Sequence, residues 1–224
     1  MKALRILSCL PLILFGFAVK AQTETVAPEP KKLQQLYLGI GGSAARTYAP
    51  DLKKGGAVFL SHLNLSFSKT TFFRAGYHFA LLSDNLINYP DLTYRGSPTP
   101  YHEVKSYYLS VGARRQLGKS FLILATAGIS YNQHFLPVNV RHIPKSTLFI
   151  FPVGDSFAYE TVRKNKPGFI IQTEILWAEQ LNYFGISLGT FFQYIPDASH
   201  GGLTLALNPG MLSRKEHSIH NSVK

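Results

Sequence analysis

The sequence predicts an all-β fold, an antiparallel up-and-down transmembrane β-barrel of eight strands. Three observations lead to this fold class. Apolar and polar residues alternate with a period of two along eight segments, which is the pattern of strands with two unlike faces. Short and long connections alternate strictly between these segments. Charged residues make up only 16% of the chain, so a large part of its surface need not meet water.

Each of the eight segments is long enough for the ~9–11 residues that a tilted strand needs to cross a bilayer. In chain order they are 35–46, 57–67, 71–82, 104–117, 120–133, 168–179, 182–195 and 202–212. One face is apolar, represented in order by Leu38, Leu63, Phe73, Leu109, Ile129, Ile175, Leu188 and Leu205. The other is small or polar, represented by Gly39, His62, Arg74, Tyr108, Ser130, Gln172, Ser187 and Asn208.

The connections follow the rule of outer-membrane barrels, in which short periplasmic turns alternate with longer outer loops. The short ones are 68–70, 118–119 and 180–181, and the long ones are 47–56, 83–103, 134–167 and 196–201. The longest contains two β-prone runs, 146–151 and 156–162. These runs fit either a hairpin that extends the barrel wall above the membrane or two further spanning strands, which would make ten.

Both ends of the chain carry processing or tail signals. Lys2 and Arg5 precede an apolar run over 6–19, which is the pattern of a signal peptide over 1–21 with cleavage after Ala21. A polar leader over 22–34, the barrel domain over 35–212 and a polar tail over 213–224 complete the predicted organisation. The only cysteine is Cys9, within the signal, so the mature chain has none for a disulfide or a thiolate metal site.

The pattern over 35–212 resembles the small bacterial outer-membrane β-barrel family, which includes the transmembrane domain of outer-membrane protein A. The Tyr- and Gly-rich strands are also similar to the porin-like barrels common in Bacteroidota. The resemblance covers nearly the whole mature chain and rests on pattern, without a diagnostic motif. It implies a location in the bacterial outer membrane. One departure is the polar tail, because such barrels often end on an aromatic residue.

If the apolar face meets lipid, the polar face lines a narrow lumen filled by side chains. The predicted lumen network consists of Arg74, Arg114, Glu174, His62, Gln172 and Gln193. We expect Glu174 to pair with Arg74 or Arg114, since an unpaired charge there would be costly. The alternative is a soluble lipocalin-like carrier with the apolar face inward. Its outer face would then be poor in charge, which is unfavourable for solubility.

The sequence predicts no catalytic site, no cofactor and no metal site. Ser61 and His62 are adjacent, so alternation sends them to opposite faces and they cannot act together. The pairs His102–Glu103 and Ser199–His200 lie at loop edges and could meet only if two loops converge. A lipid A-modifying enzyme therefore remains an alternative without a recognisable signature.

The leading functional hypothesis is a non-enzymatic protein with a structural, adhesive or binding role through its long outer loops. Loop binding candidates are Tyr89, Asp91, Tyr94, Arg95 and Tyr101. The formal charge of +11 favours anionic partners such as lipopolysaccharide phosphates, although no nucleic-acid-binding motif is present. An extracellular or envelope protein is a further possible partner, and we expect a monomer. A narrow porin-like channel is the second functional hypothesis.

Overall fold

The computed structural model describes residues 33–49, 52–84, 100–117, 120–143, 146–148, 151–153, 156–178 and 183–211. These residues belong to one compact unit. The predicted signal peptide, nearly all of the leader and the polar tail lie outside the described residues. Within the described residues, no helix has the length and apolar character needed to cross a membrane.

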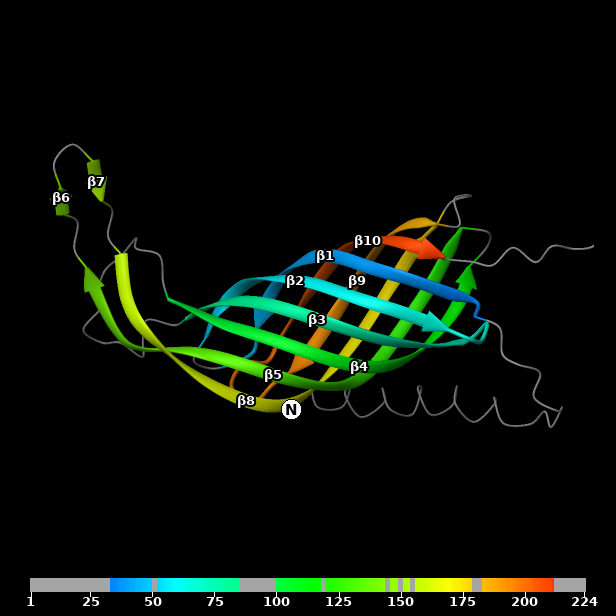
Figure 1. The fold of residues 1–224 in the computed structure, drawn as a ribbon, viewed down its shortest axis with the longest axis horizontal. Coiled ribbons are helices and arrows are strands. Elements are labelled where there is room, and N and C mark those ends of the chain that lie inside the picture. Colours follow the sequence, from blue (N-terminus) through cyan, green and yellow to red (C-terminus); the bar gives the residue numbers. More distant parts are fainter. Residues whose placement is uncertain are drawn as a thin grey trace, which may run out of the picture. The chain divides into compact units, whose positions relative to one another are not determined.

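Eight antiparallel strands close into one barrel, in the order β1-β10-β9-β8-β5-β4-β3-β2 around the ring (Figure 1). Their bounds are β1 Gln35–Thr47, β2 Leu52–Ser66, β3 Thr71–Asp84, β4 Tyr101–Leu117, β5 Phe121–Ile143, β8 Ser156–Trp177, β9 Phe184–Tyr194 and β10 His200–Met211. Two short strands, β6 Ser146–Leu148 and β7 Phe151–Val153, form a separate hairpin. The predicted eight-stranded barrel is confirmed, and the alternative of ten spanning strands is wrong.

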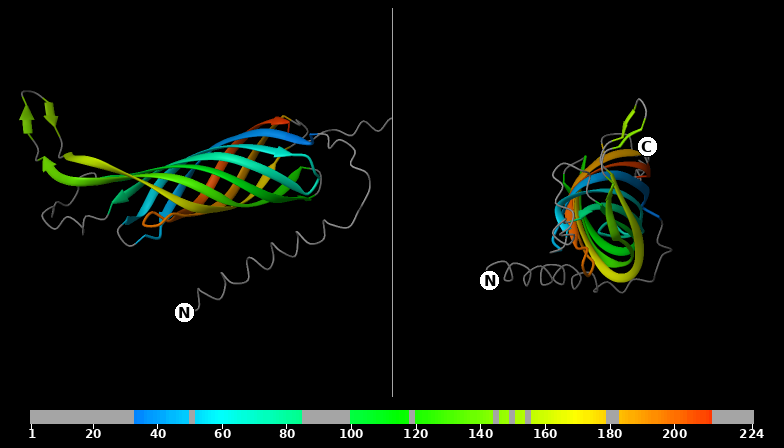
Figure 2. Two further views of the ribbon diagram at one scale, coloured as in Figure 1. Left: turned by 60° about the horizontal axis from the view of Figure 1, so that its bottom comes forward. Right: turned by 90° about the vertical axis from the view of Figure 1, so that its left-hand side faces the viewer.

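The longest strands are β5 and β8, which continue beyond the barrel wall as a two-stranded ribbon (Figures 1 and 2). Their ladder runs from Phe121 opposite Trp177 to Ile143 opposite Ser156. The pairing of β5 with β4 ends at Phe135, and that of β8 with β9 ends at Phe169. We call residues 136–143 and 156–168 the outer ribbon. An extension of the barrel wall was predicted, but the two runs 146–151 and 156–162 do not pair with each other: β6 pairs with β7, and residues 156–162 pair with β5.

The two faces of the barrel strands differ as the alternation predicts. Leu109, Ile129 and Leu188 are 65%, 74% and 61% exposed on the outside, whereas Tyr37 and Arg74 are each 2% exposed inside. The lipocalin-like alternative needs the opposite orientation and is contradicted by these exposures. The outer face is therefore an apolar belt, the arrangement that a barrel presents to lipid.

Aromatic side chains flank this apolar belt on both sides. At the short-turn end, where the connections are 67–70, 118–120 and 178–183, they are Phe67, Phe121, Trp177, Tyr183 and Phe184. At the long-loop end they are Tyr48, Tyr77, Tyr107, Tyr131, Phe169, Phe192 and Tyr194, several in ring contact, such as Phe169 with Tyr194 at 5.1 Å between centroids. Two aromatic girdles are typical of barrels whose ends lie at membrane interfaces.

The lumen contains more apolar side chains than the sequence predicts. One apolar cluster lies at the long-loop end and comprises Ala45, Leu52, Val58, Ala80, Leu82, Val104, Phe191, Ile195 and Ala198. A second lies at the short-turn end and comprises Tyr37, Phe72, Leu124 and Leu176. The description of the inner face as small or polar is therefore corrected: polar side chains fill the middle of the barrel, and apolar clusters pack at its ends.

Candidate functional site

Arg74 of β3 is the centre of the polar network in the lumen. Its Nε donates to Asn64 Oδ1 at 2.7 Å, and one terminal nitrogen donates to Gln172 Oε1 at 3.0 Å. The other terminal nitrogen forms an ion pair with the Glu174 carboxylate, and both side chains are buried. The guanidinium also lies 5.5 Å from the centroid of the Phe72 ring. Side chains from β2, from β3 itself and from β8 across the lumen thus surround one buried cation.

A chain of hydrogen bonds continues from Gln172 across the barrel. The Gln172 amide nitrogen lies 3.3 Å from His78 Nε2, and His78 Nδ1 lies 3.2 Å from Gln193 Oε1. The Gln193 amide then donates to Asn132 Oδ1 at 2.8 Å. These amide orientations assign His78 as the neutral tautomer with its proton on Nδ1.

This series of hydrogen bonds ends on β5 and β8, where the Asn132 amide donates to Ser130 Oγ at 3.1 Å and to the Lys166 carbonyl at 3.0 Å. Every member from Arg74 to Asn132 acts as donor in the same direction. The network therefore joins β2, β3, β5, β8 and β9 through the lumen and fixes how these strands face one another.

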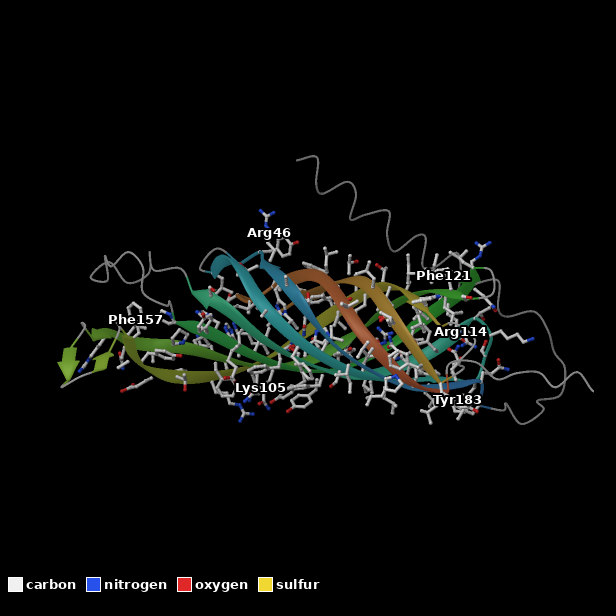
Figure 3. All side chains as sticks on the ribbon, turned by 90° about the horizontal axis from the view of Figure 1, so that it is seen from above. Arg46, Lys105, Arg114, Phe121, Phe157 and Tyr183 are labelled. Atoms are coloured by element: carbon white, nitrogen blue, oxygen red, sulfur yellow. The ribbon has the colours of Figure 1, made fainter. Side chains whose placement is uncertain are left out.

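Four of the six predicted lumen residues belong to this network, namely Arg74, Glu174, Gln172 and Gln193. Arg114 points inward but binds elsewhere: its Nε and a terminal nitrogen donate to the carbonyls of Lys69 and Ser68, at 3.1 and 2.6 Å. Figure 3 shows Arg114 near Phe121 and Tyr183, at the short-turn end. Its role is therefore to cap the β2–β3 turn.

His62 is buried beside Gly39, and neither of its ring nitrogens has a hydrogen-bond partner among the described residues. A Cβ at Gly39 would lie only 2.2 Å from His62 Nε2, so the glycine makes room for the imidazole ring. Asn64, His78 and Asn132 belong to the network without having been predicted as members. The signal that could have identified them is the same alternation, because all three lie on the inner face.

The candidate catalytic pairs do not assemble in the part of the chain that the structure describes. Ser199 Oγ bonds to the backbone of Ile195, and His200 Nδ1 lies 2.8 Å from the Ala198 carbonyl. His102 contacts His134 inside the barrel, with 2.8 Å between nitrogens, whereas Glu103 pairs with Lys105 on the outside at 2.7 Å. Ser61 and His62 occupy opposite faces, as expected.

The described residues also contain no group of three or more metal-ligating side chains. Of the loop binding candidates, Tyr89, Asp91, Tyr94 and Arg95 lie outside the described residues. Tyr101 begins β4 opposite Ser83 and is exposed on the outer face. It is thus the only candidate of this set whose position the structure supplies.

The outer ribbon is rich in exposed basic side chains. Arg141, Arg163 and Lys164 are exposed, and Arg163 Nε donates a hydrogen bond to Asn165 Oδ1 at 3.1 Å. Glu160 accepts a hydrogen bond from Asn139 at 2.8 Å, next to the bulge between Val138 and Arg141. The ribbon therefore presents more exposed positive than negative charge in its described part.

Lys166 anchors the base of the ribbon to the β9–β10 loop. It forms an ion pair with Asp197 and donates to the Pro196 carbonyl at 3.0 Å. The hydrogen bond from Lys166 lowers the pKa of the Asp197 carboxyl below its ordinary value. This contact holds the ribbon against a tight loop whose Asp197 has a positive φ of 67°.

Two solved structures share this fold. One is Ail, the attachment invasion locus protein of Yersinia pestis, in complex with the heparin analogue sucrose octasulfate; it is 10% identical, with a TM-score of 0.50, and the match covers 79% of this chain and 98% of Ail. The other is Neisserial surface protein A, which is 12% identical, with a TM-score of 0.52 and coverage of 78% and 96%. At such identities the likeness shows the fold alone.

No protein-family model and no curated protein matches the sequence. Both structural neighbours are small eight-stranded outer-membrane barrels, so the predicted resemblance to this group is confirmed at the level of the fold. The Bacteroidota type stays a prediction.

Proposed function

We propose that the chain is a bacterial outer-membrane protein that spans the membrane with its barrel, conducts no ions and binds partners through its long-loop end. The exposed apolar belt between two aromatic girdles carries the membrane assignment, because lipid is the solvent that such a face requires. Export by a signal peptide cleaved after Ala21 is part of the proposal. Because the number of strands is even, the N- and C-termini of the barrel domain then both lie on the periplasmic side.

The packing of the lumen supports a closed barrel rather than a pore. The Arg74–Glu174 network lies between the two apolar clusters, and eight strands leave an interior just wide enough for side chains. We expect no stepwise conductance when the purified protein is inserted into planar lipid bilayers. Reproducible single-channel steps from the wild-type protein would instead establish the narrow porin-like alternative.

The basic outer ribbon supports binding of a densely anionic saccharide, such as the headgroup region of lipopolysaccharide. Ail, which has the same fold, was crystallised with a heparin analogue, and this makes heparin a suitable probe. Arg141, Arg163 and Lys164 are exposed, so each can approach a sulfate or phosphate. A non-enzymatic role fits this surface better than lipid A modification, which needs a Ser–His–acid arrangement.

We expect the triple variant Arg141→Gln, Arg163→Gln, Lys164→Gln to bind heparin about tenfold more weakly than the wild type, since exposed charge contacts contribute ~0.2–1 kcal/mol each. Calorimetry in detergent, at low salt, measures this change. The matched control is Arg115→Gln, which removes one exposed cation at the short-turn end of β4. Equal heparin affinity in the triple variant and the control would rule out the ribbon as the binding surface.

A further inference from the structure

Two histidines meet inside the barrel at its long-loop end. His102 is the second residue of β4, and His134 lies on β5 beyond Tyr131 of the aromatic girdle at that end. The two residues are 6% and 0% exposed, and His102 Nδ1 lies 2.8 Å from His134 Nε2. The pair therefore lies on the inner face, past the girdle and outside the part of the barrel that lipid surrounds.

The hydrogen bond between these imidazoles leaves His134 unsatisfied. A contact between two ring nitrogens holds one proton, so one of the two nitrogens carries a bare lone pair. His134 Nδ1 is buried and has no hydrogen-bond partner among the described residues. Whichever neutral tautomer His134 adopts, one of its polar atoms stays unpaired, which is unfavourable in a buried position. Stability alone therefore does not account for this pair.

The spacing of the two nitrogens fits one class of metal ion. A metal at ~2.0–2.1 Å from each nitrogen would subtend an angle of about 84–89° across the 2.8 Å between them. That is close to the cis angle of a square-planar or tetragonal complex, the geometry of Cu(II) with nitrogen ligands. Tetrahedral Zn(II) would need the nitrogens about 3.3 Å apart. Cu(II) is also the divalent first-row ion that nitrogen sites bind most tightly.

We propose that His102 and His134 bind a Cu(II) ion at the long-loop end of the lumen. Binding replaces the shared proton and requires both rings to tilt, so that their lone pairs meet beside the line that joins the two nitrogens. The described residues contain no group of three metal-ligating side chains, so water completes the coordination. This site departs from the absence of metal expected from the sequence. It does not depend on anion binding by the outer ribbon.

The charges around the pair lie on β8 and on the β9–β10 loop. Lys164 is opposite His134 in the β5–β8 ladder, and Lys166 is opposite Asn132. Lys166 forms an ion pair with Asp197, whereas Lys164 is exposed. Because the charge of Lys164 opposes binding of a cation, Lys164→Gln should raise the Cu(II) affinity about threefold. An unchanged affinity would place the metal away from His134 and contradict the proposed site.

Cu(II) titration of the full-length protein, folded in detergent and purified without a histidine tag, tests the site. Cys9→Ser, His217→Ala and His220→Ala in the background remove the only thiol and the two histidines of the polar tail. We expect one tightly bound Cu(II) per chain, with an axial electron paramagnetic resonance spectrum split by two imidazole nitrogens. Competition with a chelator of known affinity measures the dissociation constant.

Single substitutions assign the ligands. In His102→Asn and His134→Gln the amide takes the place of the lost ring nitrogen, and either variant should bind Cu(II) at least tenfold more weakly and lose one nitrogen splitting. The matched control is His62→Gln, because His62 is a buried lumen histidine on β2 that is no part of the pair. Heat-dependent gel migration identifies the variants that remain folded.

Two results would overturn the proposal. One is a folded His102→Asn or His134→Gln variant that keeps the Cu(II) affinity and spectrum of its background protein. The other is a background protein that shows no splitting from two nitrogens, or whose splitting is lost in His62→Gln instead.

Discussion

Replacing Glu174 with glutamine should lower the free energy of unfolding by about 3–5 kcal/mol, the usual cost of removing one partner of a buried ion pair. The substitution keeps the size of the side chain but leaves the Arg74 guanidinium, which is 2% exposed, without its carboxylate. Urea unfolding in lipid vesicles, followed by the fluorescence of the single tryptophan Trp177, measures the change. Trp177 lies on the outer face of β8, so its emission reports departure from lipid.

Two controls separate the ion pair from general damage. The double variant Arg74→Leu, Glu174→Gln should be less destabilised than Glu174→Gln alone, because no uncompensated charge remains in the lumen. Arg114→Gln should cost only about 1 kcal/mol, because Arg114 binds turn carbonyls rather than a buried carboxylate. A Glu174→Gln protein within about 0.5 kcal/mol of the wild type would contradict the central role of this pair.

Replacing Leu188 with arginine should cost about 2–4 kcal/mol in lipid, the range for a cation at the midplane of a membrane barrel. Leu188 is 61% exposed, and on the outer face of β9 it lies between Phe184 and Tyr194 of the two aromatic girdles. Refolding yield and urea unfolding in vesicles measure this penalty. A soluble protein would tolerate the same change, because arginine at an exposed position is well hydrated.

The control is the same kind of substitution at a position on the outer face that lies beyond the aromatic girdle rather than at the membrane midplane. Gln133 lies on the outer face of β5, beyond Tyr131 of the girdle at the long-loop end, so Gln133→Arg should cost no more than about 1 kcal/mol. Equal, small costs at Leu188 and Gln133 would mean that the apolar belt does not face lipid.

The period-two alternation made the barrel and its two faces predictable from the sequence. In β1, for example, Leu38 continues an apolar row with Leu36 and Ile40, whereas Tyr37 alternates with small residues such as Gly39. This contrast indicates which face meets lipid and which lines the lumen. Leu124 and Ile170 were missed as lumen residues because apolar neighbours flank them on both sides, so that no alternation is visible in those stretches. Only the closed ring shows that both positions are buried inside the barrel, Leu124 within the apolar cluster at the short-turn end.

The choice between Arg74 and Arg114 as partner of Glu174 was not available from the sequence. Both arginines lie on the inner face, and their distance from Glu174 depends on how the strands are staggered around the barrel. Likewise, the segment around Asn165, Lys166 and Pro167 has the composition of a loop, yet it continues β8 because each residue pairs with β5. Pairing across the ladder, rather than local propensity, set the length of the outer ribbon.

The most direct test of the account is the heat-dependent migration of the full-length protein from cell membranes on a denaturing gel. We expect the protein to fractionate with the outer membrane and to run faster unboiled than boiled, because a closed barrel stays compact in detergent. A protein that appears in the soluble periplasmic fraction and migrates identically before and after boiling would contradict the membrane-spanning barrel.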